Sequence, residues 1–163
     1  MSRKLTTWMV PVVLGVLALS AGTLASASAN HGSGKGVVTL TFIEKSTAAT
    51  FVDVDKSGGP SVGDEFVFQS DLLDPDTHAK VGSVEGHCML ITESGDVNDC
   101  EASGTMEGGQ VRVAGGGPVD EEVTVLAVVG GTGIFRNVSG QITVETIDDS
   151  TSKDTLELTG VKH

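Results

Sequence analysis

A stretch of acidic residues between 53 and 64 has the spacing of a calcium-binding loop. Oxygen-bearing side chains stand at its first, third, fifth and twelfth positions: Asp53, Asp55, Ser57 and Asp64. With Gly58 at the sixth position, these are the residue types that a calcium loop uses. The twelfth residue is Asp rather than the longer Glu, however, and the flanking residues predict strands instead of helices. We therefore expect a solvated loop and no metal, with calcium as the alternative interpretation.

The glycine-rich stretch Gly130-Gly131-Thr132-Gly133 follows an apolar run, as a phosphate-binding loop would. A dinucleotide-binding fingerprint would need a third glycine at position 136, which is Arg136, and a helix directly after the loop. The residues that follow, 138–147, indicate another strand. Without a helix N-terminus there is no phosphate site of this type, so we predict no nucleotide binding.

Cys88 and Cys100, the only two cysteines, are spaced to meet across a hairpin. If residues 93–95 form a three-residue loop ending in Gly95, the two cysteines lie directly opposite each other. Opposed Cα atoms in antiparallel strands are roughly 4.5–5.5 Å apart, which a disulfide accepts. We therefore predict a structural disulfide. The alternative is a reactive or metal-binding thiol beside His87, although adjacent residues of a strand point to opposite faces.

The first 29 residues have the pattern of a secretory signal peptide. Arg3 and Lys4 precede an apolar run at 8–19, and small residues suited to cleavage end at Ala29. This run is too short and wrongly flanked for a membrane-spanning helix. We expect secretion without a membrane span after cleavage, a disordered tail at 30–35, and one domain over 36–163.

The charge of the chain argues against a nucleic-acid partner. Removing Arg3 and Lys4 with the signal peptide changes the formal net charge from −12 to −14. Such a surface repels phosphate backbones. The expected exported chain also has no Trp and no Tyr, because Trp8 lies in the signal peptide. Any ligand must therefore be bound without a phenol hydroxyl.

Short runs rich in Val, Ile, Thr and Phe alternate with turn-forming residues and predict an all-β fold. We expect nine strands, at 37–44, 50–54, 65–73, 79–92, 98–106, 110–114, 122–129, 141–147 and 154–160. Side chains alternate across a strand, so Leu40, Phe42 and Glu44 share one face. Both faces of several strands are partly apolar. This pattern indicates a sandwich or a closed barrel.

Four stretches, in order within residues 36–147, resemble the allene oxide cyclase and dirigent superfamily. They are Ser61-Val62-Gly63-Asp64 with the strand after it, Val81-Gly82 with Gly86-His87-Cys88-Met89-Leu90-Ile91, residues 109–115, and Gly130-Gly131-Thr132-Gly133 with Phe135. The resemblance implies an eight-stranded antiparallel barrel, so one of the nine runs is surplus or an extension. It also implies a mostly apolar cavity and a homotrimer.

The resemblance carries over to individual residues only in part. It places the catalytic Glu of the cyclases at Glu44 and their cavity Cys at Cys88. Ser46 and Ser70 stand where the cyclases have Asn, and their cavity Tyr has no counterpart. Besides Ser70, the possible ligand-binding residues are Phe42, Phe66, Phe68 and Leu90.

Two functions follow as hypotheses. The first is an exported barrel that binds a small apolar molecule and catalyses its cyclisation or isomerisation without a cofactor, largely by orienting it, with Glu44 as the polar assistant. The second is a non-catalytic barrel that carries a ligand or directs stereochemistry as dirigent proteins do. An open cavity containing Glu44 would favour the first hypothesis, and a filled core would favour the second.

Overall fold

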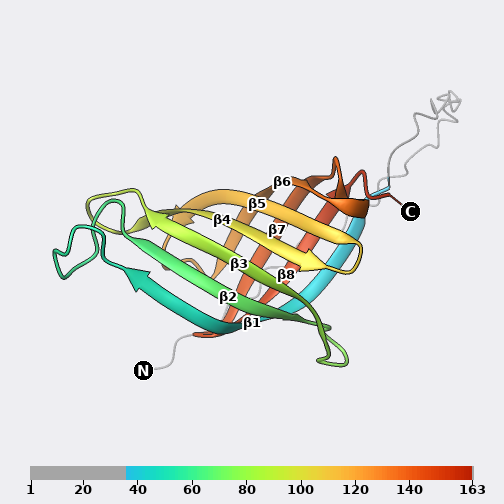
Figure 1. Ribbon diagram of the computed structural model, residues 1–163, viewed down its shortest axis with the longest axis horizontal. Helices are drawn as coiled ribbons and strands as arrows, with labels where there is room; N and C mark the ends of the chain where they lie inside the picture. The colour runs from blue at the N-terminus through green and yellow to red at the C-terminus, as the bar shows by residue number, and fades with distance from the viewer. Residues whose placement is uncertain (1–35, 163) are drawn as a thin grey trace, which may run out of the picture. The chain divides into compact units, whose positions relative to one another are not determined.

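Eight antiparallel strands form a closed barrel, which confirms the predicted fold class (Figure 1). The computed structural model describes residues 36–162. The strands are β1 (Val38–Val52), β2 (Glu65–Leu73), β3 (Lys80–Leu90), β4 (Val97–Met106), β5 (Gly109–Pro118), β6 (Val123–Gly131), β7 (Ser139–Asp148) and β8 (Thr151–Thr159), with one helical turn, η1 (Gly133–Phe135). The expected signal peptide and tail, 1–35, lie outside the described residues. Within 36–162, no helix has the length and apolar character needed to span a membrane.

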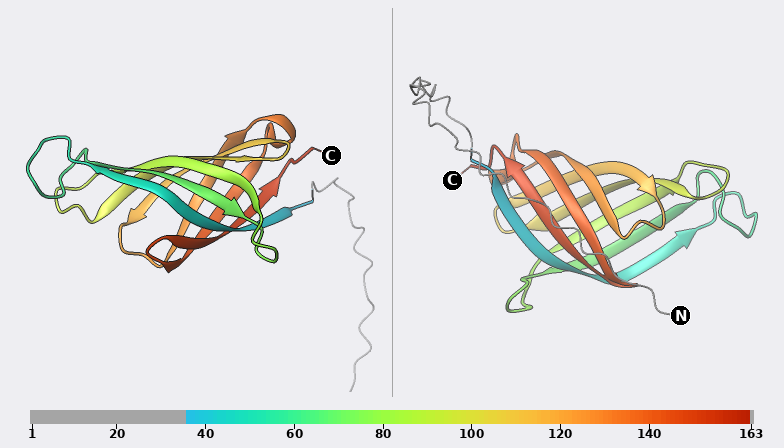
Figure 2. Two further views of the ribbon diagram at one scale, coloured as in Figure 1. Left: turned by 60° about the horizontal axis from the view of Figure 1, so that its bottom comes forward. Right: turned by 180° about the vertical axis from the view of Figure 1, so that it is seen from behind.

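The prediction of nine strands is wrong by one, because runs 37–44 and 50–54 form the single strand β1. The pairing register of β1 shifts between Ser46 and Ala48, which indicates a β-bulge at Thr47. A bulge bends a strand without ending it. The first part of β1 therefore pairs with β8 over 38–45, and its last part pairs with β2 over 43–52 (Figure 2).

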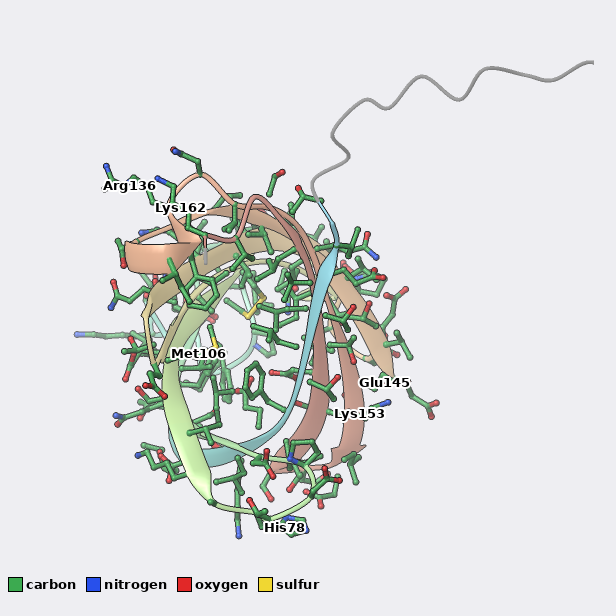
Figure 3. All side chains as sticks on the ribbon, turned by 90° about the vertical axis from the view of Figure 1, so that its right-hand side faces the viewer. His78, Met106, Arg136, Glu145, Lys153 and Lys162 are labelled. Atoms are coloured by element: carbon green, nitrogen blue, oxygen red, sulfur yellow. A yellow bond between two sulfur atoms is a disulfide. The ribbon has the colours of Figure 1, made fainter. Side chains whose placement is uncertain are left out.

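The end of the barrel near η1 is filled by a compact apolar core. Its buried members come from β5 to β8 and from the η1 segment: Val111, Val113, Leu126, Val128, Phe135, Val138, Ile142, Leu156 and Leu158. Phe135 belongs to η1, so the turn after β6 supplies a plug for this end. Figure 3 views the barrel from its right-hand side in Figure 1, with the side chains added.

The glycine-rich stretch spans the end of β6 and the start of η1, which Thr132 connects. Gly133 has a φ of 61°, a left-handed conformation that favours glycine, and a Cβ there would collide with the carbonyl of Gly108. The Ile134 N–H donates to that same carbonyl at 3.0 Å. The motif therefore packs η1 against the β4–β5 turn. A single helical turn follows it, and no longer helix begins there.

Next to the filled end, two small residues of β4, Ala102 and Gly104, leave space on the inner face. Gly104 pairs with Val84 of β3 and with Val111 of β5. A Cβ built at Gly104 would meet nothing closer than 3.9 Å. The filled end therefore borders a hollow part of the barrel, and Val113 and Leu126 belong to both the core and the wall of the hollow part.

Val128 and Val129 on β6 test the assignment of inner and outer faces. Val128 is 6% exposed within the core, whereas Val129 is 57% exposed. Val128→Ala should lower the free energy of unfolding by about 1–3 kcal/mol, and Val129→Ala should change it by less than about 0.5 kcal/mol. Urea denaturation of both variants measures the difference. A larger loss for Val129→Ala than for Val128→Ala would mean that β6 presents the opposite face to the core.

Candidate functional site

The hollow part of the barrel encloses a cavity of about 280 Å³. Most of its lining is apolar and comes from every strand of the barrel, including Phe42, Phe68, Leu72, Val84, Met106, Val113, Leu126, Val144 and Leu156. Polar side chains in the wall are fewer: Glu44, Asn98, Glu121, Thr124, Thr146, Ser152 and Asp154. A concave, mainly apolar space with a few polar groups is typical of a small-molecule site.

Two carboxyl groups, those of Glu44 and Asp154, face the cavity from neighbouring strands. Glu44 pairs with Ser152 across β1 and β8, and Asp154 pairs with Phe42. Because side chains alternate, the two carboxyl groups are diagonal neighbours on the inner face. Asp154 is only 1% exposed, and the Ser152 Oγ donates to its Oδ1 at 2.8 Å.

The surroundings of Asp154 favour the protonated form of its carboxyl group. Burial raises the pKa of this carboxyl from its ordinary 3.8 to about 8, and a hydrogen bond with Glu44 and the charge of Glu44 raise it further in the same direction. The hydrogen bond from Ser152 acts in the opposite direction and is the smallest contribution. Burial and a neighbouring carboxylate are the physical causes that favour the neutral form of an acid.

This pair can supply both a proton and a negative charge inside an apolar cavity. A carboxylic acid that remains protonated near pH 7 can donate its proton to a ligand atom as a general acid. A carboxylate beside it can stabilise positive charge that develops on the ligand, and the effect is stronger where water is excluded. Of this pair, only Glu44 was predicted from the sequence.

Asp154 was missed although its pattern was visible in the sequence. Asp154, Leu156 and Leu158 occupy alternate positions of one strand and share its inner face. A lone carboxylate on an otherwise apolar face is an uncommon arrangement. That position alone would have identified Asp154 as a candidate, but its partnership with Glu44 depends on β8 pairing with β1.

The other residues predicted for the site differ in their burial and in whether they line the cavity. Phe42 and Phe68 line the cavity together with Glu44. Ser70 faces inward but is buried, 2% exposed, and does not line the cavity. Phe66 is 45% exposed on β2, where its ring stacks on Phe68 with 6.4 Å between ring centres. Leu90 is half-buried and pairs with Asn98 where the β3–β4 hairpin ends.

The predicted disulfide between Cys88 and Cys100 is confirmed, and it also forms part of the cavity wall (Figure 3). The two residues are directly paired, as the three-residue loop requires, and Gly95 has the left-handed φ of 68° expected there. Both cysteines of the chain are in this bond, so no thiol remains for the alternative of metal binding.

The acidic loop brings Asp53, Asp55 and Asp64 together, with one carboxylate oxygen of each within 4.8 Å of the others. Asp64 is buried and has a structural role, because it accepts hydrogen bonds from the backbone N–H groups of Val54 and Ser61, each at 2.8 Å. Ser57 Oγ donates to the Gly59 carbonyl at 3.0 Å. Asp53 Oδ1 is buried without a hydrogen-bond partner. The prediction of a solvated loop without a metal, with calcium as the alternative, stays a prediction.

Comparison with known proteins yields one family and several similar barrels. The family model described as dirigent-like protein matches residues 37–161. A pyocyanin demethylase is 27% identical, covering 75% of this chain and 100% of its own, with a TM-score of 0.67. The pterocarpan synthase dirigent protein GePTS1 is 17% identical over 76% of this chain and 83% of its own, with a TM-score of 0.59.

A third similar structure is the Diels Alderase AbmU from Streptomyces koyangensis. It is 14% identical, covers 80% of this chain and 71% of its own, and has a TM-score of 0.62. At this level of identity, the likeness to AbmU and to GePTS1 shows the fold alone. No curated protein gives a significant sequence match.

The raised pKa of Asp154 predicts that the protein loses stability as the pH rises from 4 to 8. In this window the unfolded chain, with a carboxyl pKa of 3.8, binds fewer protons than the native state, where the pKa is about 8. The free energy of unfolding therefore falls with increasing pH, by a few kcal/mol for this group.

Asp154→Asn removes this titrating group, so the free energy of unfolding should change less with pH in this variant than in the wild type. Urea denaturation at pH 5 and pH 8 measures it, with Glu157→Gln, exposed on the same strand, as the control. The control should keep the wild-type loss. A wild type that loses no more stability than Asp154→Asn over this range would show that Asp154 is not a buried neutral acid.

Proposed function

This chain belongs to the dirigent-like protein family, and we propose that its barrel binds a small apolar molecule in the cavity. The observation that carries the proposal is the combination of a mainly apolar cavity and the adjacent carboxyl groups of Glu44 and Asp154 in its wall. A filled barrel would bury apolar side chains throughout. Here Ala102 and Gly104 leave room on one wall, where larger side chains would increase buried apolar area.

We further propose that the carboxyl pair assists a cyclisation or isomerisation of the bound molecule. Asp154 would donate its proton to a ligand oxygen or unsaturated carbon, and Glu44 would stabilise the resulting positive charge. Return of a proton to the carboxyl pair completes an isomerisation with no net change in atoms or electrons. The apolar walls would fix the conformation that closes, which is catalysis by orientation.

Several of the similar structures are named for reactions of small molecules, which supports such chemistry within this fold. They include a demethylase of pyocyanin, a Diels Alderase and a dirigent protein with pterocarpan synthase activity. The reactions named for these proteins differ. The shared fold is therefore evidence for a cavity, and the evidence for a particular reaction must come from the carboxyl pair.

The second candidate is a barrel that carries a ligand or directs its stereochemistry without catalysis. The complete absence of Tyr favours it, because the cyclases that the sequence resembles use a cavity Tyr. Native mass spectrometry of protein purified from its host identifies any co-purifying molecule. Conversion of that molecule by wild type but not by Glu44→Gln supports catalysis, whereas unchanged ligand in both supports a carrier.

Secretion is proposed on two grounds. Residues 1–29 have the composition of a signal peptide. The Cys88–Cys100 disulfide fits an oxidising compartment, where such bonds form and persist. N-terminal sequencing of the mature protein from culture medium would be expected to begin at Asn30.

We also propose a homotrimer in which the outer face of β6 is buried. Val123 and Val125 share that face and are each at least half exposed. Two outward valines on one strand are an apolar stripe that association would cover. Val125, at 54% exposure, lies opposite Thr143 of β7.

Val125→Lys tests this surface. A lysine there should convert the trimer to monomer, because its ammonium group would be buried against apolar side chains. Light scattering after size-exclusion chromatography measures the mass. Lys replacing Val37, also exposed but outside the stripe, is the control. A variant that remains trimeric would place the interface elsewhere.

Filling the cavity tests the proposed binding function. Ala102→Leu adds volume at the wall and should weaken binding of 1-methylnaphthalene, a neutral apolar probe, at least tenfold by steric exclusion. Gly104→Ala should weaken it less, because its added methyl group meets nothing closer than 3.9 Å. Probe fluorescence can be followed without Trp emission from the mature chain, since Trp8 is the only Trp.

Ala79→Leu is the matched control, because Ala79 is exposed between β2 and β3 and does not line the cavity. It should leave binding unchanged. Thermal unfolding of all three variants checks that they fold. If Ala102→Leu folds and binds the probe as the wild type does, the cavity is not the binding site.

A further inference from the structure

We infer that the ligand of this cavity is a small, largely apolar organic cation, such as a molecule with a protonated amine or a quaternised ring nitrogen. The inference rests on the proposed binding function and narrows its substrate class. Three observations carry it: the signs of the charges in the wall, the outward direction of the nearby basic side chains, and the aromatic rings in the same cavity wall.

All the charged side chains in the cavity wall are acidic. Glu44, Glu121 and Asp154 line the cavity, and among the described residues that line it none is Lys, Arg or His. Glu121 lies in the β5–β6 connection, where its Oε2 would be 3.8 Å from a Cβ at Gly117. An anionic ligand would therefore meet repulsion from two separate parts of the wall.

The basic residues next to the carboxyl pair in sequence point away from it. Lys153 precedes Asp154 on β8, but its Nζ lies 2.7 Å from Glu145 Oε2 on the outer face (Figure 3). Lys45 follows Glu44 on β1 and is exposed. Among the residues that line the cavity, no cation offsets the negative charge of the pair, so a ligand cation can fill that role.

The surroundings of Asp154 determine how a cation would bind. Glu44 faces it from β1, and β7 contributes the uncharged Val144 and Thr146 to the same wall. Burial and Glu44 raise the pKa of Asp154 to about 8, so its carboxyl group favours the form that holds a proton. A bound cation would favour the charged form and release that proton, so toward a cationic ligand Asp154 acts as a second carboxylate and not as the acid of the proposed reaction. Affinity for a cation should therefore increase between pH 6 and pH 9.

Two aromatic rings favour an organic cation over a metal ion. Phe42 pairs directly with Asp154 across β1 and β8, and Phe68 lies in the same wall. The face of an aromatic ring attracts an ammonium or a quaternised nitrogen. Ca²⁺ instead takes six to eight oxygen ligands, whereas the wall around the pair is dominated by apolar side chains such as Leu72 and Leu156.

Three probes of similar size and different charge test the inference: N-methylquinolinium, 1-methylnaphthalene and 1-naphthoate. Fluorescence titration of the full chain should give at least tenfold tighter binding of the cation than of the neutral probe at pH 8, and the weakest binding for the anion. Glu44→Gln combined with Asp154→Asn should reduce the cation preference at least tenfold while the neutral probe still binds. Retained binding of the neutral probe shows that the variant has an intact cavity.

Glu157→Gln together with Asp99→Asn removes the same number of acidic groups from outside the cavity and is the matched control. It should keep the cation preference. If the double cavity variant also keeps it, surface charge is responsible and the inference is wrong. Displacement of the cation by micromolar Ca²⁺ would identify a metal site and overturn it too.

The same fluorescence titration distinguishes the cation preference from the proposed binding function. Equal binding of the neutral and cationic probes by the wild type would refute the cation preference and leave the proposed binding function standing. Failure of all three probes to bind would refute both.

Discussion

The alternation of side chains in a closed ring of strands is the constraint on which the rest of the structure depends. Once β1 pairs with β8 and the ring closes, every strand must present one set of alternate residues to the interior. That requirement places Leu158 and Val128 in the core, and it places Glu44 and Asp154 in the cavity. It also turns the disulfide inward. A shift of one residue in β8 would exchange Asp154 for Lys153 and remove the site.

Different residues fill one end of the barrel and leave space in the hollow part. At one end, η1 and the large apolar residues of β5 to β8 complete a core. In the hollow part, Ala102, Gly104 and their neighbours leave space that no other strand fills. Stability can therefore come from the filled end, while the hollow part retains an acid that is unfavourable to bury in its charged form. Family membership, the cavity and the carboxyl pair together support binding of a small molecule.

Much of the fold could be predicted from local sequence, and the exceptions have physical reasons. The Cys88–Cys100 pairing followed from a hairpin whose loop needed Gly95 in a left-handed conformation. The shared face of Leu40, Phe42 and Glu44 on β1, which the structure turns inward, followed from alternation. The length of β1 did not, because the polar residues around Thr47 resemble a turn when in fact they form a bulge between two partners. The Glu44–Asp154 pair was also beyond reach, since residues 110 positions apart meet only through ring closure. Whether a cavity exists depends on side-chain volumes summed over all eight strands.

The proposed chemistry requires a carboxylic acid that remains protonated inside this cavity at neutral pH. The side-chain carboxyl ¹³C chemical shift of Asp154 reports its protonation when it is followed by NMR between pH 3 and pH 10 and assigned with Asp154→Asn. A buried acid should give a midpoint that corresponds to a pKa of about 8. A midpoint near the ordinary 3.8 would show a solvated carboxylate, which could not serve as the acid of the cavity.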